Sequence, residues 1–423
     1  MIKEILPLNK IKTKVIISGS KSITNRALII SSLIKGKTKI VNPSYSDDSK
    51  YLIEALKKIG VIIKLKKNYI IVIGNGGEFL PYSNKIYIGN AGTAIRFMTS
   101  LLTLGNGKYV IDCDERMKER PIGDLVESLI SLGANIKYLE KNGYPPLEIT
   151  GKKIEGGVIQ IKGDKSSQFI SSLLMLSPFL KYGLTINILD ELVSKPYINT
   201  TINIMQDFGV KVINKNYSSF IIYPDQKYNA KKYKIPGDAS SATYFMAACA
   251  ICGGKIKIKN VGYSCNQGDI YFAHLLKEMG AKVKIKKNFV IIKSNKKLNG
   301  IKVDLSNTPD IVQTLIITAL FAENETYVFN IKNLRIKETD RLLALENELK
   351  KIGAKVETGE DWIRVIPAKT YNSCEIETYN DHRMAMSFAI AGLKIKGLKI
   401  RNPSVVTKSF PEFWNVFEKL YEK

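Results

Sequence analysis

The stretch that decides the fold is LKKIGVIIKLKKNYIIVI, residues 56–73. It joins the end of an amphipathic helix to Gly60 and then to two strand-like runs on either side of the turn Lys67-Asn68. Glycine often ends a helix in a left-handed conformation because it has no Cβ. Alternation of apolar and polar residues with a period of two predicts paired strands. The stretch therefore predicts a helix, a glycine cap and a β-hairpin.

The same phrase occurs five times, at intervals of about 70 residues. The other copies are residues 129–149, 205–223, 276–293 and 349–366, with glycines at Gly133, Gly209, Gly280 and Gly353. Upstream of each copy, small and polar residues open an apolar helix, in residues 19–34, 89–104, 163–180, 237–251 and 307–322. A fixed period indicates that one supersecondary unit is used repeatedly.

A sixth helix opening, NDHRMAMSFAIAGL, covers residues 380–393 and is followed by a final amphipathic helix at 410–423 but by no hairpin. We expect the N-terminal segment, residues 4–17, to supply the missing strands. The sequence thus predicts an α/β fold of six βαβαββ units. The first helices are so apolar that we expect them to be buried, with their N-termini converging at one end of each domain.

Six units could form one ring or two groups of three, and the chain length of 423 residues favours two domains. If N-terminal strands complete the last unit, the chain must cross between the domains twice. We expect these crossings near residue 19 and near Gly237. The first domain then covers 19–236, the second covers 1–18 with 237–423, and two strands form the hinge.

The composition is that of a globular protein, with 45% hydrophobic and 24% charged residues. No leader peptide and no run of eighteen apolar residues is evident, so we expect a cytoplasmic protein without membrane contact. Five scattered cysteines fit a reducing compartment. Cys249 and Cys252 form a C-x-x-C inside an apolar helix, and only two histidines are present, so we expect no metal and no cofactor.

The net charge of +25 has three candidate explanations: a solvated surface, a nucleic-acid partner, or a small substrate with several negative charges. The lysines are spread over turns and helix faces, as in KKNY, KKNF and NKKL, which favours a solvated surface. We therefore expect no nucleic-acid partner, and we expect part of the charge to serve an anionic substrate.

The helix openings carry the candidate chemistry, because a helix N-terminus offers free N–H groups and about half a positive charge to an anion. In SGSKSITNR, residues 18–26, Lys21 and Asn25 are four apart, as are Ser22 and Arg26. The stretch is either a serine-capped helix with solvated charges or a phosphate site. It is not a P-loop, because only one residue separates Gly19 from Lys21.

Ten motifs then appear in order across the whole chain: GSKSITNRA, GNAGTAIR, RMKERPIG, SSQF, ELVSKPY, GDASSA, TPD, KETDR, NDHRMAM and TKSFPEF. Together they resemble the 5-enolpyruvylshikimate-3-phosphate synthases, an enolpyruvyl transferase family. The resemblance implies a monomer with two domains, each an inside-out α/β barrel of three units. It implies 3-phosphoshikimate 1-carboxyvinyltransferase activity in the shikimate pathway, towards chorismate and the aromatic amino acids. The enolpyruvyl group of phosphoenolpyruvate passes to the 5-hydroxyl of shikimate 3-phosphate, and phosphate is released.

The resemblance also implies the site residues. Those matching shikimate 3-phosphate contacts are Lys21, Ser22, Arg26, Ser166, Ser167, Gln168, Ser194, Asp310, Asn333 and Lys337. Those matching phosphoenolpyruvate contacts are Lys21, Gly92, Arg120, Gln168, Arg341, Arg383 and Lys408. Asp310 would be the base that deprotonates the 5-hydroxyl, and Glu338 the acid that protonates C3. Lys21 would meet both substrates.

One related family uses UDP-N-acetylglucosamine as acceptor and has a cysteine five residues before its arginine-proline pair. Here that position holds Glu115, and Cys113 lies seven residues before Arg120, which disfavours membership of this related family.

At position 97 this chain has phenylalanine, where many 5-enolpyruvylshikimate-3-phosphate synthases have proline. Gly92 leaves room for the inhibitor glyphosate, whereas Phe97 could shift the helix that begins there.

Overall fold

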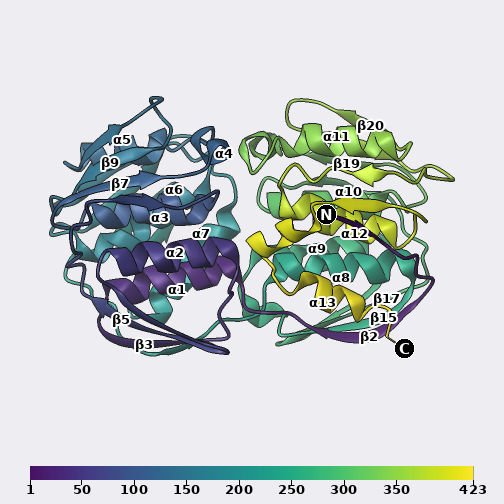
Figure 1. The fold of residues 1–423 in the computed structure, drawn as a ribbon, viewed down its shortest axis with the longest axis horizontal. Coiled ribbons are helices and arrows are strands. Elements are labelled where there is room, and N and C mark those ends of the chain that lie inside the picture. Colours follow the sequence, from purple (N-terminus) through teal and green to yellow (C-terminus); the bar gives the residue numbers. More distant parts are fainter. Residues whose placement is uncertain (423) are drawn as a thin grey trace. The chain divides into compact units, whose positions relative to one another are not determined.

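The computed structural model describes residues 1–422 as two compact α/β units (Figure 1). Unit 1 comprises Met1–Ser18 and the chain from Pro236 onward, and unit 2 comprises Gly19–Ile235. The chain passes between the units twice, after Ser18 and after Ile235. No helix among residues 1–422 is long and apolar enough to span a membrane.

The elements of unit 2 are α1 (Lys21–Leu33), β3 (Lys35–Val41), α2 (Asp47–Lys58), β4 (Ile62–Lys66), β5 (Tyr69–Asn75), β6 (Lys85–Tyr87), α3 (Gly92–Leu102), β7 (Lys108–Asp112), α4 (Glu115–Lys118), α5 (Gly123–Ser131), β8 (Asn135–Tyr138), β9 (Leu147–Thr150), β10 (Gly157–Ile161), α6 (Ser167–Leu176), η1 (Ser177–Phe179), β11 (Leu184–Ile188), α7 (Lys195–Asp207), β12 (Ile213–Lys215), β13 (Ser219–Ile222) and β14 (Lys232–Lys234).

The elements of unit 1 are β1 (Ile2–Glu4), β2 (Ile11–Ile16), α8 (Ala239–Cys252), β15 (Gly254–Lys259), η2 (Tyr263–Cys265), η3 (Gly268–Ile270), α9 (Tyr271–Glu278), β16 (Lys282–Ile285), β17 (Phe289–Ser294), β18 (Lys302–Asp304), η4 (Pro309–Ile311), α10 (Val312–Ala319), β19 (Thr326–Phe329), η5 (Lys332–Ile336), α11 (Arg341–Lys351), β20 (Lys355–Thr358), β21 (Ile363–Ile366), β22 (Glu375–Ile376), α12 (His382–Gly392), β23 (Lys399–Arg401), η6 (Pro403–Lys408) and α13 (Phe413–Glu418). The predicted last helix, residues 410–423, is shorter in the structure, where α13 begins at Phe413 and ends at Glu418; Lys423 lies outside the described residues.

The five repeated phrases form the predicted helix, glycine and hairpin. Their glycines follow α2, α5, α7, α9 and α11 with φ of +93°, +93°, +98°, +107° and +78° in chain order. Each is followed by an antiparallel pair: β4 with β5, β8 with β9, β12 with β13, β16 with β17, and β20 with β21. A positive φ costs glycine little, which explains why this residue recurs at the junction.

The first helix of each repeat is buried, as predicted. Every residue of α3 is buried, and every residue of α12 as well. In unit 2, α3 packs against α1 and α6, and in unit 1, α8, α10 and α12 pack against one another. Figure 1 shows α1 and α3 between the strands β3 and β5 and the strands β7 and β9. Burial on all sides agrees with the largely apolar sequences of these helices.

Six small sheets flank these helices. Their strand orders are β14-β3-β5-β4, β6-β7-β9-β8 and β10-β11-β13-β12 in unit 2, and β2-β15-β17-β16, β18-β19-β21-β20 and β1-β23-β22 in unit 1. Each is a separate sheet of three or four strands, so the expected inside-out barrel consists of three sheets that do not join into a closed barrel.

The predicted role of the N-terminal segment is correct for one strand and wrong for the other. Strand β1 pairs antiparallel with β23 and completes the sixth unit. Strand β2, however, pairs parallel with β15 in the fourth unit. The reason is an exchange of strands: β14, which precedes α8, pairs with β3 in unit 2 and leaves the parallel position beside β15 to β2. An unfilled edge would leave backbone groups unpaired, so each crossing strand completes the sheet of its own unit.

The outer face of the sheet β2-β15-β17-β16 carries much of the positive charge. Lys12, Lys255, Lys293 and Lys282 lie in one register row across its four strands. On the same face, the neighbouring Lys14 lowers the pKa of Lys259. Like charges directly opposite each other in a sheet repel, so this face contributes solvation and not stability.

Replacing Lys255 with glutamate should therefore stabilise the protein by less than about 1 kcal/mol, because the new carboxylate faces Lys12 and Lys293 in register. The thermal unfolding midpoint should rise at low ionic strength, and the gain should shrink in high salt. Lys85→Glu is the matched control, because it breaks the 3.0 Å pair with Asp112 and should lower the midpoint. A salt-independent gain would contradict the electrostatic explanation.

Candidate active site

At the start of α1, Lys21 and Asn25, which are four residues apart in the sequence, lie in different environments. Lys21 is the first helical residue, and its Nζ lies 2.8 Å from Oδ2 of Asp48. Asn25 is fully buried, and its Oδ1 accepts a hydrogen bond from Ser49 Oγ at 2.8 Å. The side chain of Ser20 at the N-cap makes no capping hydrogen bond. Asn25 is therefore a core residue, whereas the start of α1 can still receive an anion.

Arg26 is a buried cation one turn into α1. Its Nε donates to Thr201 Oγ1 at 2.7 Å, and Nη1 donates to the carbonyl oxygen of Ser22 at 2.9 Å. Nη2 donates to Ser171 Oγ and to the carbonyl oxygen of Tyr197, both at 3.4 Å. These acceptors are neutral, and burial lowers the pKa of Arg26 to about 10. The guanidinium is still charged at pH 7 and is ready for an anionic ligand.

A second cationic cluster surrounds the start of α3. A Cβ built on Gly92, the first residue of this helix, would come within 2.8 Å of Arg120 Nη2 and 2.9 Å of Arg96 Nη1. Both arginines are buried, and the helix start carries no side-chain cap. Arg120 Nη1 also donates to Asn90 Oδ1 at 3.0 Å. A side chain at position 92 would therefore displace the two guanidinium groups from these positions.

The predicted neutral donors lie at the starts of α6 and α7. Ser166 caps α6 by accepting from the backbone N–H of Gln168 at 3.3 Å, and Ser167 is the next residue. Gln168 Oε1 accepts from Arg96 Nη1 at 2.7 Å, which joins this helix start to the Gly92 cluster. Ser194 precedes α7 in a left-handed conformation and makes no side-chain cap.

In unit 1 one arginine holds three carboxylates. Arg341 is 1% exposed, and its Nη1, Nη2 and Nε lie 3.1 Å from Asp310 Oδ1, 2.8 Å from Glu338 Oε2 and 2.7 Å from Asp381 Oδ2. Burial would lower the pKa of Arg341, but the three carboxylates outweigh that effect and raise it above its ordinary value. Arg341 is therefore a permanent cation around which the candidate acid and base are arranged.

Asp310 is held by a second arginine as well. Arg383 Nη2 lies 2.7 Å from Asp310 Oδ2, and the carboxyl group retains 27% side-chain exposure. Burial raises the pKa of Asp310, while Arg383, Arg341 and Lys337 lower it more strongly and hold it well below its usual range. Arg383 Nη1 also donates to the hydroxyl of Tyr244 at 3.4 Å, so the starts of α8, α10 and α12 meet here.

The remaining predicted residues of unit 1 lie on or next to 3₁₀ segments. Asn333 belongs to η5 and is 6% exposed, and its amide oxygen and nitrogen have no partner among the described residues. Lys337 directly follows η5 and precedes Glu338. Lys408 ends η6 and its side chain is 9% exposed. Buried amides are normally hydrogen-bonded, so water or a polar ligand group would satisfy this one.

Three residues that contact the predicted site residues are absent from the set predicted from the sequence. Asp48 pairs with Lys21, Asp381 pairs with Arg341, and Arg96 orients Gln168. Arg96 and Asp381 lie in the helix openings GNAGTAIR and NDHRMAM, so their position at a helix start was a usable signal. Asp48 lies on α2, and its partner could be identified only after folding.

The cysteines have no reactive environment. Burial raises the pKa of Cys113, Cys249 and Cys252 to about 12, so each is a neutral thiol at pH 7. Among residues 1–422 no cluster of three or more His, Cys, Asp or Glu side chains could hold a metal ion.

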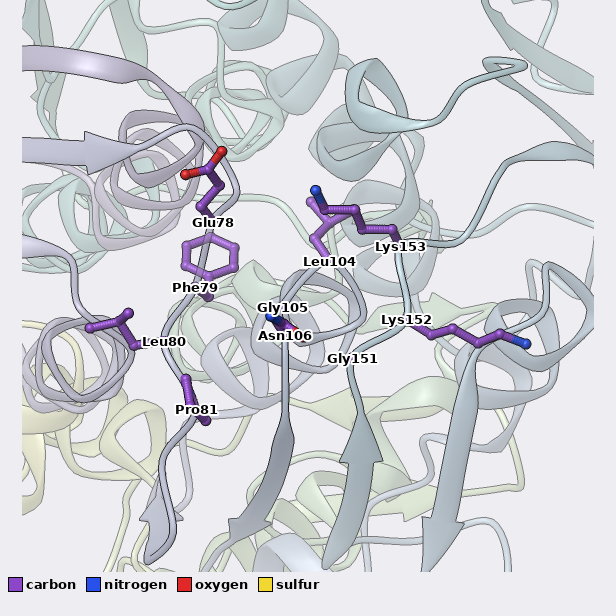
Figure 2. A pocket seen from close by; sticks show the side chains of 10 residues that line it. All are labelled: Glu78, Phe79, Leu80, Pro81, Leu104, Gly105, Asn106, Gly151, Lys152 and Lys153. Atoms are coloured by element: carbon purple, nitrogen blue, oxygen red, sulfur yellow. The ribbon is translucent and has the colours of Figure 1, made fainter.

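A hollow of about 600 Å³ in unit 2 lies apart from these residues. Figure 2 shows its lining, which comes from Glu78–Pro81, Leu104–Asn106 and Gly151–Lys153. It adjoins the C-terminal end of α3, where the helix dipole is negative and disfavours an anion. The predicted site residue of α3, Gly92, lies at the opposite end of that helix, where it is the first residue.

Comparison with known proteins shows the enzyme class to which the chain is similar. A family model described as EPSP synthase (3-phosphoshikimate 1-carboxyvinyltransferase) matches residues 5–417. Two proteins named 3-phosphoshikimate 1-carboxyvinyltransferase, from Shewanella baltica and a Sulfurovum species, are 43% and 45% identical over 418 residues. These alignments cover 98% of this chain and 98% of each relative. The chain therefore falls in the class of carboxyvinyltransferases.

The chain belongs to the EPSP synthase family, as its ten motifs predicted. The structure of EPSP synthase from Acinetobacter baumannii, solved at 2.37 Å, superimposes with a TM-score of 0.83 at 25% identity. That superposition covers 99% of this chain and 98% of the other. The predicted fold class is therefore confirmed.

Proposed function

We propose that this chain transfers the enolpyruvyl group of phosphoenolpyruvate to the 5-hydroxyl of shikimate 3-phosphate and releases phosphate. The supporting observation is the chemistry of the helix starts. Each unit presents buried arginines at helix N-termini, and unit 1 adds a carboxylate whose pKa is held low. Two substrates that each carry a phosphate and a carboxylate need this charge.

We assign shikimate 3-phosphate to the neutral donors and to Arg26. The guanidinium of Arg26 is buried beside neutral acceptors only, so a phosphate would supply the negative charge that the free protein lacks there. The unpaired amide of Asn333 fits a hydroxyl or phosphate oxygen. The full proposed set is Lys21, Ser22, Arg26, Ser166, Ser167, Gln168, Ser194, Asp310, Asn333 and Lys337.

We assign phosphoenolpyruvate to the arginine clusters, with Lys21 and Gln168 meeting both substrates. The full proposed set is Lys21, Gly92, Arg120, Gln168, Arg341, Arg383 and Lys408. Arg341 and Arg383 are occupied by carboxylates in the free protein. Substrate anions would compete for the same donors, so binding would loosen Asp310 and Glu338 from Arg341.

Asp310 acts as the base in this mechanism. Its low pKa keeps it ionised, so it can accept the proton of the 5-hydroxyl as the oxygen attacks C2 of phosphoenolpyruvate. Glu338 delivers the proton to C3, and the two roles reverse when the tetrahedral intermediate loses phosphate. Glu338 must first gain a proton, which its 2.8 Å contact with Arg341 opposes. Release of Arg341 to the substrate would remove that obstacle.

We also propose that the protein is a monomeric cytoplasmic enzyme that works without a cofactor. Its domains are the two units, each with three repeats, and the two crossings act as its hinge.

The decisive measurement is phosphate release from phosphoenolpyruvate, with shikimate 3-phosphate or UDP-N-acetylglucosamine as acceptor. We expect release with the first acceptor alone. Release with the second alone would assign the chain to the other enolpyruvyl transferase reaction, against which the burial and high pKa of Cys113 already argue. Release with neither acceptor would refute the proposal.

Gly92→Ala should raise the KM for phosphoenolpyruvate at least tenfold, since about 1.4 kcal/mol of lost binding corresponds to a factor of ten. The added methyl group would press on Arg120 and Arg96, which both have atoms within 3.0 Å of the position it would take. The KM for shikimate 3-phosphate should change less. Gly123→Ala is a control, because the nearest atom to its Cβ would be 3.3 Å away and belongs to Gly143. Equal effects on both substrates would contradict the assignment of Gly92.

A further inference from the structure

The ring of Phe97 lies against the guanidinium of Arg26. The distance from Arg26 Cζ to the ring centroid is 5.4 Å, within the range of a cation–π interaction. Arg26 belongs to α1 and Phe97 to the middle of α3, and the two side chains are 2% and 1% exposed. The contact thus joins two central helices of unit 2 inside a water-excluded region.

The other contacts of Arg26 show what the ring contributes. The edge of the guanidinium is held by the hydroxyls of Thr201 and Ser171 and by backbone carbonyls. No carboxylate forms an ion pair with Arg26 anywhere in the described chain. A carboxylate would orient the guanidinium but would also neutralise it and compete with an incoming phosphate. The electron-rich ring face attracts the cation and leaves its net charge available.

We propose that Phe97 is a positioning residue for Arg26, fixing the guanidinium plane for a negatively charged group of shikimate 3-phosphate. This inference rests on the proposed role of Arg26. Phe97 also follows Arg96, which orients Gln168, so the same turn of α3 supports both candidate clusters of unit 2. A second pair repeats the arrangement, because Arg96 Cζ lies 5.3 Å from the ring centroid of Phe169 on α6.

The test changes the electrons of the ring while keeping its shape. Phe97 is replaced by 4-fluoro-, 3,5-difluoro- and 3,4,5-trifluorophenylalanine in the full-length enzyme. Each fluorine weakens the negative face of the ring, so the KM for shikimate 3-phosphate should rise stepwise, to about tenfold for the trifluoro ring. The KM for phosphoenolpyruvate and kcat should stay within about twofold, and the unfolding midpoint should not follow the series.

The matched control is the same series at Phe245, a fully buried ring that packs on Phe410 and Phe413 in unit 1. Fluorination there should leave the KM for shikimate 3-phosphate unchanged. A KM that does not rise at position 97, or that rises equally at position 245, would overturn the role of Phe97. Phe97→Leu, which keeps apolar volume without a ring, should raise the same KM at least as much as the trifluoro ring.

A further variant separates the role of Phe97 from the assignment of Arg26. If Arg26→Gln leaves the KM for shikimate 3-phosphate unchanged, the proposed role of Arg26 is wrong and the role of Phe97 falls with it. If Arg26→Gln raises that KM strongly while the fluorine series is flat, only the role of Phe97 is wrong.

Discussion

Replacing Asp310 with asparagine should lower kcat by about 10²–10⁴, the usual contribution of a general base. Arg341 and Arg383 lie 3.1 and 2.7 Å from different oxygens of the carboxylate. Asparagine keeps the shape of the side chain, but its single oxygen can accept from only one of the two arginines, and its NH2 group faces the other. It cannot take the proton of the 5-hydroxyl. Because Asp310 is one of ten proposed contacts of shikimate 3-phosphate, we expect that substrate still to bind while turnover is lost, as measured by calorimetry and by phosphate release.

Asp304→Asn is the control for this experiment. Asp304 is a more exposed carboxylate on β18 whose oxygens accept from Ser306 and Asn330, and it touches none of the proposed site residues. Turnover of this variant should match that of the parent. Substantial activity in Asp310→Asn would remove Asp310 as the base.

The pH dependence follows from the direction of the Asp310 pKa. Because the folded pKa lies below the ordinary value of 3.8, Asp310 is ionised at every pH above about 4. Its protonation therefore cannot cause an acidic fall of kcat/KM above that pH.

The stability that the ionised form of Asp310 contributes is present above pH 3.8 and is lost as the pH falls towards the lower folded pKa. Asp310→Asn should therefore lose less stability than the parent between about pH 4 and about pH 2, in urea unfolding. An equal loss would contradict the low pKa.

Replacing Arg26 with glutamine should raise the KM for shikimate 3-phosphate at least 100-fold, because each charge-assisted hydrogen bond to a phosphate contributes about 1.5–3 kcal/mol. The free protein should not lose stability in proportion. Burial already lowers the pKa of Arg26 to about 10, and no carboxylate compensates for the buried charge among the residues that the structure describes. Glutamine removes that charge and keeps one donor for Thr201 or Ser171. The thermal midpoint should therefore be equal to or higher than that of the parent.

Arg335→Gln is the control: it replaces an arginine that is paired with a carboxylate and lies outside the proposed site. Arg335 is 30% exposed and pairs with Asp340 at 2.8 Å on η5 and the start of α11. Its loss should lower the midpoint slightly and leave the KM for shikimate 3-phosphate unchanged. If Arg26→Gln destabilised the protein strongly while binding shikimate 3-phosphate normally, Arg26 would be a structural residue and not a binding residue.

Much of the site could be identified from the sequence, because its residues lie at helix starts whose local patterns repeat. Lys21, Gly92, Ser166 and Arg341 each open a helix or cap one, as their motifs indicated. The partners of these residues could not be identified in the same way. Asp48 reaches Lys21 across 27 residues and Asp381 reaches Arg341 across 40, and neither spacing has a local periodicity.

The sequence by itself determined the repeat: five glycines at helix ends, five hairpins and the buried first helices follow from local backbone preference and hydrophobic period. Only the tertiary structure decided which strands join which sheet, as β2 and β14 show, because strand pairing depends on which sheet edge lies open after the chain crosses. It also decided that Arg26 faces a ring and neutral acceptors while Arg341 faces three carboxylates. Identical residue types acquire opposite electrostatic environments through contacts between distant segments, and no local pattern encodes those contacts.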